Sequence, residues 1–288
     1  MAGLSYVNFL PALVSALATG IGSSPAQAGE IVAMNGYGGL IGSVLAVFIV
    51  SRVSWKPIVM LCLASLVAFD FFTQWFIDYQ SLIIWRLFAG VFGGVSLGIA
   101  FSVLGRLANP DRAFGCLLFI QFTVGSLVIY YTPILELVQG AYSIFFIMAG
   151  IGLLSLLLML LLPSIRFSND KKAADKQQQS TVIKASLLML AIILFQTAAS
   201  AIWAYVSLIG AAADIPIADV SLYVATTGML GLLGAIIPMF KSQAASRTFW
   251  LTTGSCFSII AAIIMVYAPL SAGVFILAMS LPFLSGQQ

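Results

Sequence analysis

Residues Tyr142–Leu162 read YSIFFIMAGIGLLSLLLMLLL, and residues Arg166–Ser180, just beyond them, read RFSNDKKAADKQQQS. The first segment carries no charge and is long enough to cross a bilayer, which takes about 20 residues of α-helix. The second segment is charged and rich in Gln, a composition typical of a flexible linker. Together the two segments predict a membrane-spanning helix that ends in a long polar loop.

The rest of the chain has the same apolar character. Its 288 residues are 61% hydrophobic and 7% charged, with a mean hydropathy of +1.11. A water-soluble domain of this size could not bury so much apolar surface, so the sequence predicts an integral membrane protein. Its spans must be helical, because a bilayer offers no partner for free backbone amides and the runs lack the alternation of barrel strands.

We identify ten apolar runs of spanning length, of which the last is short. Six precede the polar loop and four follow it, so the expected fold is an all-α integral membrane protein with about ten transmembrane helices. The runs are Leu4–Gly20, Ile31–Val50, Pro57–Ile77, Ser81–Gly105, Ala113–Leu135, Tyr142–Leu162, Ile183–Leu208, Val220–Phe240, Phe249–Ala268 and Leu270–Leu284.

The charges predict an orientation, because Lys and Arg are enriched in the cytoplasmic loops of membrane proteins. Of the 12 basic residues, all but Arg86 lie in the connections that follow even-numbered spans or, for Lys184, at the very start of the next run. We therefore expect a cytoplasmic N-terminus. The basic residues of these connections are Arg52, Lys56, Arg106, Arg112, Arg166, Lys171, Lys172, Lys176, Lys184, Lys241 and Arg247, and the intervening connections hold Glu30, Asp78, Glu136, Asp214 and Asp219.

Little in the sequence points to catalysis. There is no His, and Cys62, Cys116 and Cys256 fall inside apolar runs, where a thiol is usually a small packing residue. The sequence contains no nucleophile elbow, phosphate loop or zinc spacing. We expect no enzyme activity, no cofactor, no metal and no disulfide. The net charge of +3 follows from the basic loops and does not indicate a nucleic-acid partner.

A short repeat relates the two sides of the polar loop. Gly36-Tyr-Gly-Gly39-Leu-Ile-Gly42 in the second run matches Gly228-Met-Leu-Gly231-Leu-Leu-Gly234 in the eighth. Both runs are expected to cross from outside to inside, so the repeat is parallel and relates two halves by an axis along the membrane normal. The glycines by themselves predict a small-residue surface on which another helix can pack closely.

Local sequence carries a family resemblance. The fourth run reads Arg86-Leu-Phe-Ala-Gly90-Val-Phe-Gly93-Gly94, and Asn8-Phe-Leu-Pro11 and Pro110-Asp111-Arg112-Ala113-Phe114 look like stretches of bacterial transporters. With six spans, a charged loop and a parallel second set, the chain resembles the major facilitator superfamily along essentially its whole length. It departs from the family between the second and third runs, where Ser51-Arg52-Val53-Ser54-Trp55-Lys56 lacks the usual acidic residue and glycine.

The resemblance implies a six-helix bundle over residues 1–165, a cytoplasmic linker over 166–182 and an incomplete four-helix bundle over 183–288. It implies a fragment that lacks the last two helices, a multi-pass location in the cell (inner) membrane and a monomer. It also implies secondary transport of a small organic solute by alternating access, with proton coupling left open and drug efflux disfavoured.

The helices that face a central cavity in this family supply the candidate substrate and coupling residues. Each of these polar or aromatic side chains could instead satisfy a neighbouring helix, and the amides of Asn35 and Gln121 are the better candidates because buried amides need partners. The candidates on these helices are Tyr6, Asn8, Asn35, Tyr37, Arg86, Gln121, Gln196, Trp203, Tyr223 and Thr227, and Asp70 on the peripheral third helix is added as a residue that would tune Arg86.

Asp70 and Arg86 are the two charges deepest in the predicted membrane. Asp70 lies eight residues before the turn near Asp78 and Tyr79, and Arg86 lies seven after that turn. At 1.5 Å per residue both are roughly 10–12 Å below the turn on antiparallel neighbours, so they can pair. Intramembrane charges either find a partner or mark function. Two interpretations follow: a buried pair that holds the hairpin, or an Arg86 that faces the cavity.

Two other classes of protein remain open. A ten-span chain of this length also resembles drug/metabolite transporters, which are built from inverted five-helix halves, but the polar loop and the parallel glycine repeat argue against that architecture. A non-transporting membrane scaffold, a receptor-like protein or a membrane enzyme has no motif to support or exclude it.

Overall fold

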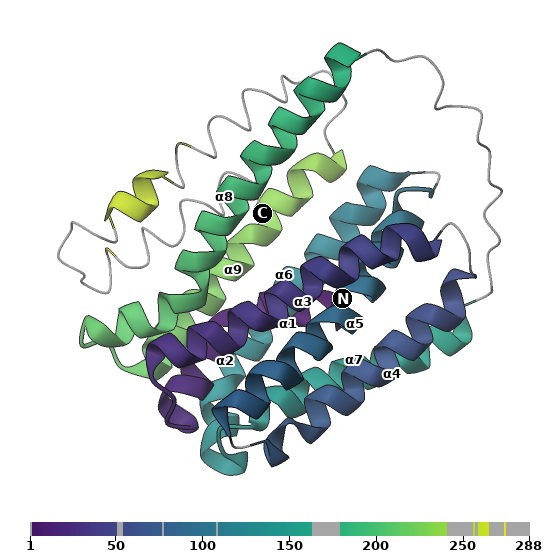
Figure 1. Ribbon diagram of the computed structural model, residues 1–288. Helices are drawn as coiled ribbons and strands as arrows, with labels where there is room; N and C mark the ends of the chain where they lie inside the picture. The colour runs from purple at the N-terminus through teal and green to yellow at the C-terminus, as the bar shows by residue number, and fades with distance from the viewer. Residues whose placement is uncertain are drawn as a thin grey trace.

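The computed structural model describes residues 2–50, 54–76, 78–107, 109–162, 179–240, 256, 259–264 and 274. Over these ranges the regular structure is entirely helical, which confirms the predicted all-α fold (Figure 1). The helices are α1 (Ser5–Asn8), α2 (Leu10–Ser15), α3 (Pro25–Val50), α4 (Trp55–Phe72), α5 (Tyr79–Leu104), α6 (Pro110–Gln139), α7 (Ser143–Leu161), α8 (Gln179–Ala212) and α9 (Ile217–Phe240).

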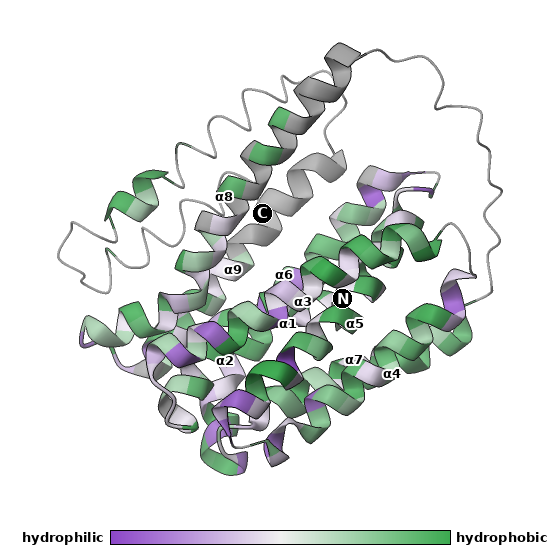
Figure 2. Ribbon diagram, in the orientation of Figure 1, coloured by the Kyte–Doolittle hydropathy of each residue, from purple (hydrophilic) through white to green (hydrophobic). Residues whose placement is uncertain are grey.

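Helices α3 to α9 correspond to the second to eighth predicted spans. Five stretches of the described chain, which fall on α3 to α7, are long and apolar enough to cross a membrane. Figure 2 shows hydrophobic residues along most of their length. Residues 259–264 of the predicted ninth span are helical, whereas the tenth span and most of the predicted linker lie outside the described residues. The division of the chain at that linker therefore stays a prediction.

The first predicted span is helical but broken. A 3-10 turn (Ala2–Leu4) leads into α1, α2 begins after Phe9, and a π-helical turn (Ala16–Gly20) closes the span. Pro11 explains the break, because it has no amide hydrogen to continue the hydrogen bonding of α1 and its ring crowds the preceding turn. The break separates Tyr6 and Asn8 on α1 from the apolar residues of α2.

Local sequence sets the ends of several helices. Ser24 and Gln27 form a reciprocal capping box at the start of α3, with Ser24 N to Gln27 Oε1 at 3.0 Å and Gln27 N to Ser24 Oγ at 3.2 Å. Asp78 caps α5 by accepting a hydrogen bond from the Ser81 amide. Gly140 ends α6 with φ +80°, a conformation that favours glycine, so that α7 can begin three residues later.

The helices form two sets that contact each other: the first set consists of α1 to α7, and the second set of α8 and α9. Within the first set α3 packs on α5, and α4 packs on both α5 and α7. The second set holds α8 and α9, which join the first set where α9 lies on α6 and α8 lies on α2. The largest buried cluster includes Phe9, Leu13, Ile31 and Phe145 of the first set and Ala204 of α8. The core thus extends from the first set into the junction.

The contact between α3 and α5 is made by glycine backbones. A Cβ built at Gly42 would lie 2.1 Å from the Val91 oxygen, and one at Gly94 would lie 2.1 Å from the Gly39 oxygen. Gly38 and Gly90 are equally close to backbone atoms of the opposite helix. Only glycine permits so close an approach.

The predicted close packing is therefore present, but its spacing differs from the glycines three apart in the sequence repeat. The contact uses Gly38 and Gly42, which are four apart and so face one side of a helix, whereas a Cβ at Gly36 would meet open space. In the matching segment of α9, Gly228 contacts Ser126 of α6, and the side-chain surroundings of Gly231 and Gly234 lie outside the described residues.

Candidate functional site

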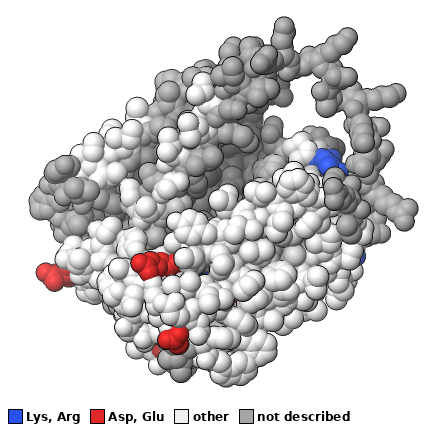
Figure 3. Space-filling view, viewed as in Figure 1, with Lys and Arg blue, Asp and Glu red and all other residues white. Residues whose placement is uncertain are grey.

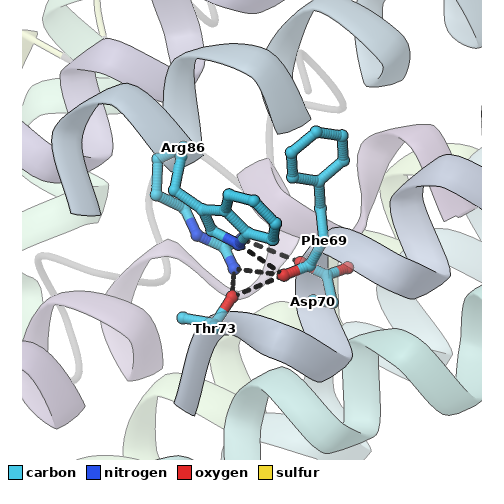
Figure 4. Close-up of polar contacts among 5 residues, drawn as sticks. Phe69, Asp70, Thr73 and Arg86 are labelled. Atoms are coloured by element: carbon cyan, nitrogen blue, oxygen red, sulfur yellow. Dashed lines mark hydrogen bonds and ion pairs between the residues drawn. The ribbon is translucent and has the colours of Figure 1, made fainter. Parts of the chain in front are cut away.

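Arg86 and Asp70 form a buried ion pair between α5 and α4, as the depth argument predicted. Arg86 Nη1 lies 2.8 Å from Asp70 Oδ1, and the two side chains are 1% and 6% exposed. Arg86 Nη2 donates to the Thr73 hydroxyl and, at 3.4 Å, to the Phe69 carbonyl (Figure 4). The guanidinium is therefore held by three acceptors at the end of α4 and in the turn that follows it: the Phe69 carbonyl, the Asp70 carboxylate and the Thr73 hydroxyl.

The end of α4 makes these acceptors available. After Phe72 the helix tightens into a 3-10 turn (Thr73–Trp75), and the Thr73 amide donates to the Asp70 carbonyl. The Phe69 carbonyl instead accepts from the Thr73 hydroxyl at 2.7 Å and from Trp85 Nε1 at 2.8 Å. Such a tightened last turn satisfies carbonyls that a helix end would leave without a partner.

Arg86 also contacts α7, which packs beside the first span. Its Cζ lies 4.5 Å from the ring centroid of Phe145, within the range of a cation–π interaction. Tyr6 of α1 belongs to the same buried cluster as Phe145. Arg86 Nε and the Tyr6 hydroxyl have no hydrogen-bond partner within the part of the chain that the structure describes.

This geometry favours the structural interpretation of the pair. The Arg86 charge is neutralised by Asp70 and enclosed by α4, α5 and α7, so it does not present a free cation to a solute. Removing either partner would leave an uncompensated charge inside the bundle, which is far more costly than removing both. The pair therefore acts as a fixed link between helices of the first set.

The remaining candidate residues are dispersed. Asn8 is buried on α1 opposite Gly125 of α6, where a Cβ at Gly125 would lie 3.8 Å from the Asn8 Cβ. Trp203 is half-buried on α8 and packs against two apolar clusters, one centred on α2 and one between α6 and α9. Asn8 is thus on a helix that packs on α6, which contacts α9, and Trp203 is on α8, which contacts α2.

The other candidate residues lie on α3, α6, α8 and α9, and the structure does not bring them together in one site within the described residues. Asn35 and Gln121 are half-buried on α3 and α6, and Tyr37 is 59% exposed. Thr227 is 1% exposed and donates to the Val224 carbonyl at 2.9 Å, so its hydroxyl is satisfied within α9. Tyr223 packs into the cluster between α6 and α9. The side chain of Gln196 lies outside the described residues.

The junction between α8 and the first set is built near the beginning of α3. The Tyr205 hydroxyl donates to the Pro25 carbonyl at 3.4 Å and lies over Gly29. Around it, Ala204 and Leu208 of α8 pack with Leu17 and Ile31. Figure 1 shows α8 and α3 apart at the opposite end, where α3 ends and α8 begins.

Some of these contacts could be anticipated from the sequence and others could not. Thr73 lies three residues after Asp70, on the same side of a helix, and that spacing could have identified it as a partner of Arg86. Phe145 and Tyr205 carry no local signal, because their contacts depend on how distant helices pack. Gly29 lies in the connection before the second apolar run, where a glycine by itself indicates little.

Helices α3 to α7 are long and apolar enough to cross a membrane, which defines the class of the protein: an α-helical membrane protein. The sequence model of the Major Facilitator Superfamily matches residues 1–286, and the chain belongs to this family, whose members are transporters and not enzymes. The match decides against the inverted five-plus-five architecture of drug/metabolite transporters.

Solved structures show the same fold at low sequence identity. The crystal structure of the nucleoside transporter NupG is 15% identical with a TM-score of 0.69, and the comparison covers 99% of this chain and 78% of that one. The crystal structure of a D-xylose-proton symporter is 14% identical with a TM-score of 0.59 and the same coverage. No curated protein sequence matched the chain.

Proposed function

We propose that this chain, as a monomer in the cytoplasmic membrane, carries a small uncharged organic solute by alternating access between its two helical sets. In such a mechanism the two sets rock about a site near the middle of the membrane, which opens to one side at a time. The proposal requires a junction that is closed at one end of the molecule and open at the other.

The observation that carries the proposal is the contact between α3 and α8, which is made near the beginning of α3. Near its beginning, Ala28 and Ile31 are 0% and 1% exposed, in the cluster that includes residues of α8. Near its end, Leu40 and Val47 are 66% and 71% exposed. The residues of α3 that face α5 stay buried to the end of the helix, where Ala46 is 2% exposed, so Leu40 and Val47 are exposed on the face away from α5. A junction made at one end of α3 is what a carrier open to one side requires.

The charges support an orientation for this state. Figure 3 shows the Asp and Glu side chains of this face near the end where α3 begins, and Lys and Arg mainly at the opposite end. Since basic residues mark the cytoplasmic side, the proposed orientation has the beginning of α3 facing outward and its end facing the cytoplasm. On this orientation the N-terminus is cytoplasmic, and the contact of α8 near the beginning of α3 supports an inward-facing state.

The chemistry of the junction supports an uncharged solute. Asn8, Gln121 and Trp203 offer amides and an aromatic face, whereas Arg86 is neutralised by Asp70. An anionic substrate would need a free cation, and none of the candidate residues supplies one. A solute with hydroxyls and a ring or ring-like face, such as a nucleoside or a pentose, matches these groups, and structures similar to this chain include a nucleoside transporter and a D-xylose symporter.

Transport by purified protein in liposomes tests the proposal. We expect saturable uptake of a labelled nucleoside or pentose, and a comparison with and without an inward proton gradient will show whether protons are coupled. Trp203→Ala and Gln121→Ala should each reduce uptake by about tenfold, the loss of roughly 1.4 kcal/mol of binding. Tyr131→Phe, at a tyrosine 50% exposed on α6, is the matched control. Absence of uptake and of binding for both solute classes would contradict the proposal.

A further inference from the structure

Tyr205 reaches from α8 to the first turns of α3 in a way that only a glycine allows. Its hydroxyl oxygen lies 1.8 Å from the position that a Cβ of residue 29 would occupy, and its Cζ lies 3.0 Å from that position. The same hydroxyl donates to the carbonyl of Pro25, four residues earlier on α3. Any other residue at position 29 would displace the ring from this seat.

The backbone of α3 around Gly29, on which the Tyr205 ring lies, is held in place by other helices of the first set. Next to Gly29, the carboxylate of Glu30 accepts a hydrogen bond from the Tyr79 hydroxyl at the start of α5. The preceding residue, Ala28, is fully buried in the cluster that α3 shares with α2 and α8. Tyr205 therefore docks on a backbone that is held in place by its own bundle.

The contact is of a kind that can separate. It consists of one tyrosine tip with one long hydrogen bond, surrounded by apolar side chains from Trp203, Ala204 and Leu208. By contrast, α3 and α5 meet backbone to backbone within the first set. A side chain can withdraw from over a glycine without moving either helix, whereas two backbones in direct contact can separate only if the helices themselves move apart.

We infer that Tyr205 seated on Gly29 is an outer latch, which closes the extracellular entrance between the two helical sets in the inward-facing state. The inference rests on the proposed alternating access, and it names the contact that must break when the carrier opens outward. Because the ring fits only over a residue without a side chain, Gly29 is as necessary to the latch as Tyr205 is.

Accessibility of a single cysteine tests the latch without any substrate. Cys62, Cys116 and Cys256 are replaced by Ala, and Ala204→Cys, at a position 8% exposed beside the latch, is labelled in intact cells with an impermeant maleimide. Gly29→Ala should increase the labelling rate by about tenfold, which corresponds to a shift of about 1.4 kcal/mol toward the outward-open state. Gly36→Ala, where a Cβ meets open space on the same helix, should leave the rate unchanged.

A second variant protects the test against misfolding. Tyr205→Ala removes the latch without adding bulk and should also increase labelling by about tenfold. Gln139→Cys, at an exposed residue at the end of α6, reports that the outer face is accessible in every variant. Labelling of Ala204→Cys that stays at the parent rate in folded Gly29→Ala, or in Tyr205→Ala if the first variant does not fold, overturns the latch.

The same variants distinguish the latch from the proposed function. Increased labelling together with no uptake of any solute would support the latch and contradict the proposed transport. Uptake that is present while labelling does not change would support transport and overturn the latch.

Discussion

Helix α3 contacts α5 and α8 through glycine in two different ways. Toward α5, Gly38 and Gly42 bring backbone against backbone, and near them the Arg86–Asp70 pair links α5 to α4. Toward α8, Gly29 receives only the tip of Tyr205. Backbone contacts and buried ion pairs have no low-cost alternative arrangement, whereas a side chain can change rotamer and leave. The interior of the first set is therefore built to stay together, and its junction with α8 is built to separate.

The largest expected effect concerns the Arg86–Asp70 pair. Asp70→Ala should destabilise the protein by about 3–5 kcal/mol, because it leaves the Arg86 charge buried without a counter-charge, and Arg86→Ala should do the same to Asp70. The thermal unfolding midpoint in detergent and the yield of folded protein measure the loss.

The double variant Arg86→Ala/Asp70→Ala separates the roles of the pair. If the pair only links helices, the double variant should regain most of the stability and should transport. A double variant that folds but does not transport, together with partial activity of Arg86→Lys, would instead assign Arg86 a part in coupling.

The next largest effect concerns the contact between α3 and α5. Gly42→Ala places a Cβ 2.1 Å from the Val91 oxygen, and since neither backbone can move aside, we expect a loss of about 1–3 kcal/mol in unfolding free energy. Gly36→Ala is the control, and it should be neutral or slightly stabilising, by up to about 1 kcal/mol, because alanine favours helix. Equal stability of the two variants would show that α3 and α5 are not in backbone contact.

The smallest effect is expected where α6 meets α9. Gly228→Ala brings a Cβ within 2.6 Å of Ser126 Oγ, but a serine side chain can rotate away, so the change in unfolding free energy should stay within about 0.5 kcal/mol. Ser126→Ala in the same protein should abolish even that cost, as a double-mutant cycle on thermal unfolding would show. A cost as large as that of Gly42→Ala would mean that this contact is also rigid.

The fold could be predicted from the sequence to a large extent, because membrane spans depend on local composition. Seven of the predicted spans correspond to α3 through α9, and the antiparallel arrangement of α4 and α5 was enough to predict the Arg86–Asp70 pair. The break in the first span was not predicted, although Pro11 was present as its signal.

The candidate site was less predictable. Tyr37 and Thr227 are candidates because of their residue types and their helices, and the sequence did not indicate that the first is exposed or that the hydroxyl of the second is bonded within α9. Tyr205 and Gly29 are 176 positions apart in the sequence, and no local pattern around either residue indicates that they are in contact. Contacts between helical sets depend on packing angles that composition does not encode.

Distances between spin labels on α3 and α8 test the separable junction most directly. One pair of cysteines at Ala26 and Ala212 reports the outer ends, a second pair at Val47 and Leu187 reports the inner ends, and a third pair at Val47 and Phe101 reports α3 against α5; all are exposed positions. In Gly29→Ala we predict that the outer distance lengthens, the inner distance shortens and the α3–α5 distance stays unchanged. Outer and inner distances that change in the same direction, or an α3–α5 distance that changes with them, would contradict the account.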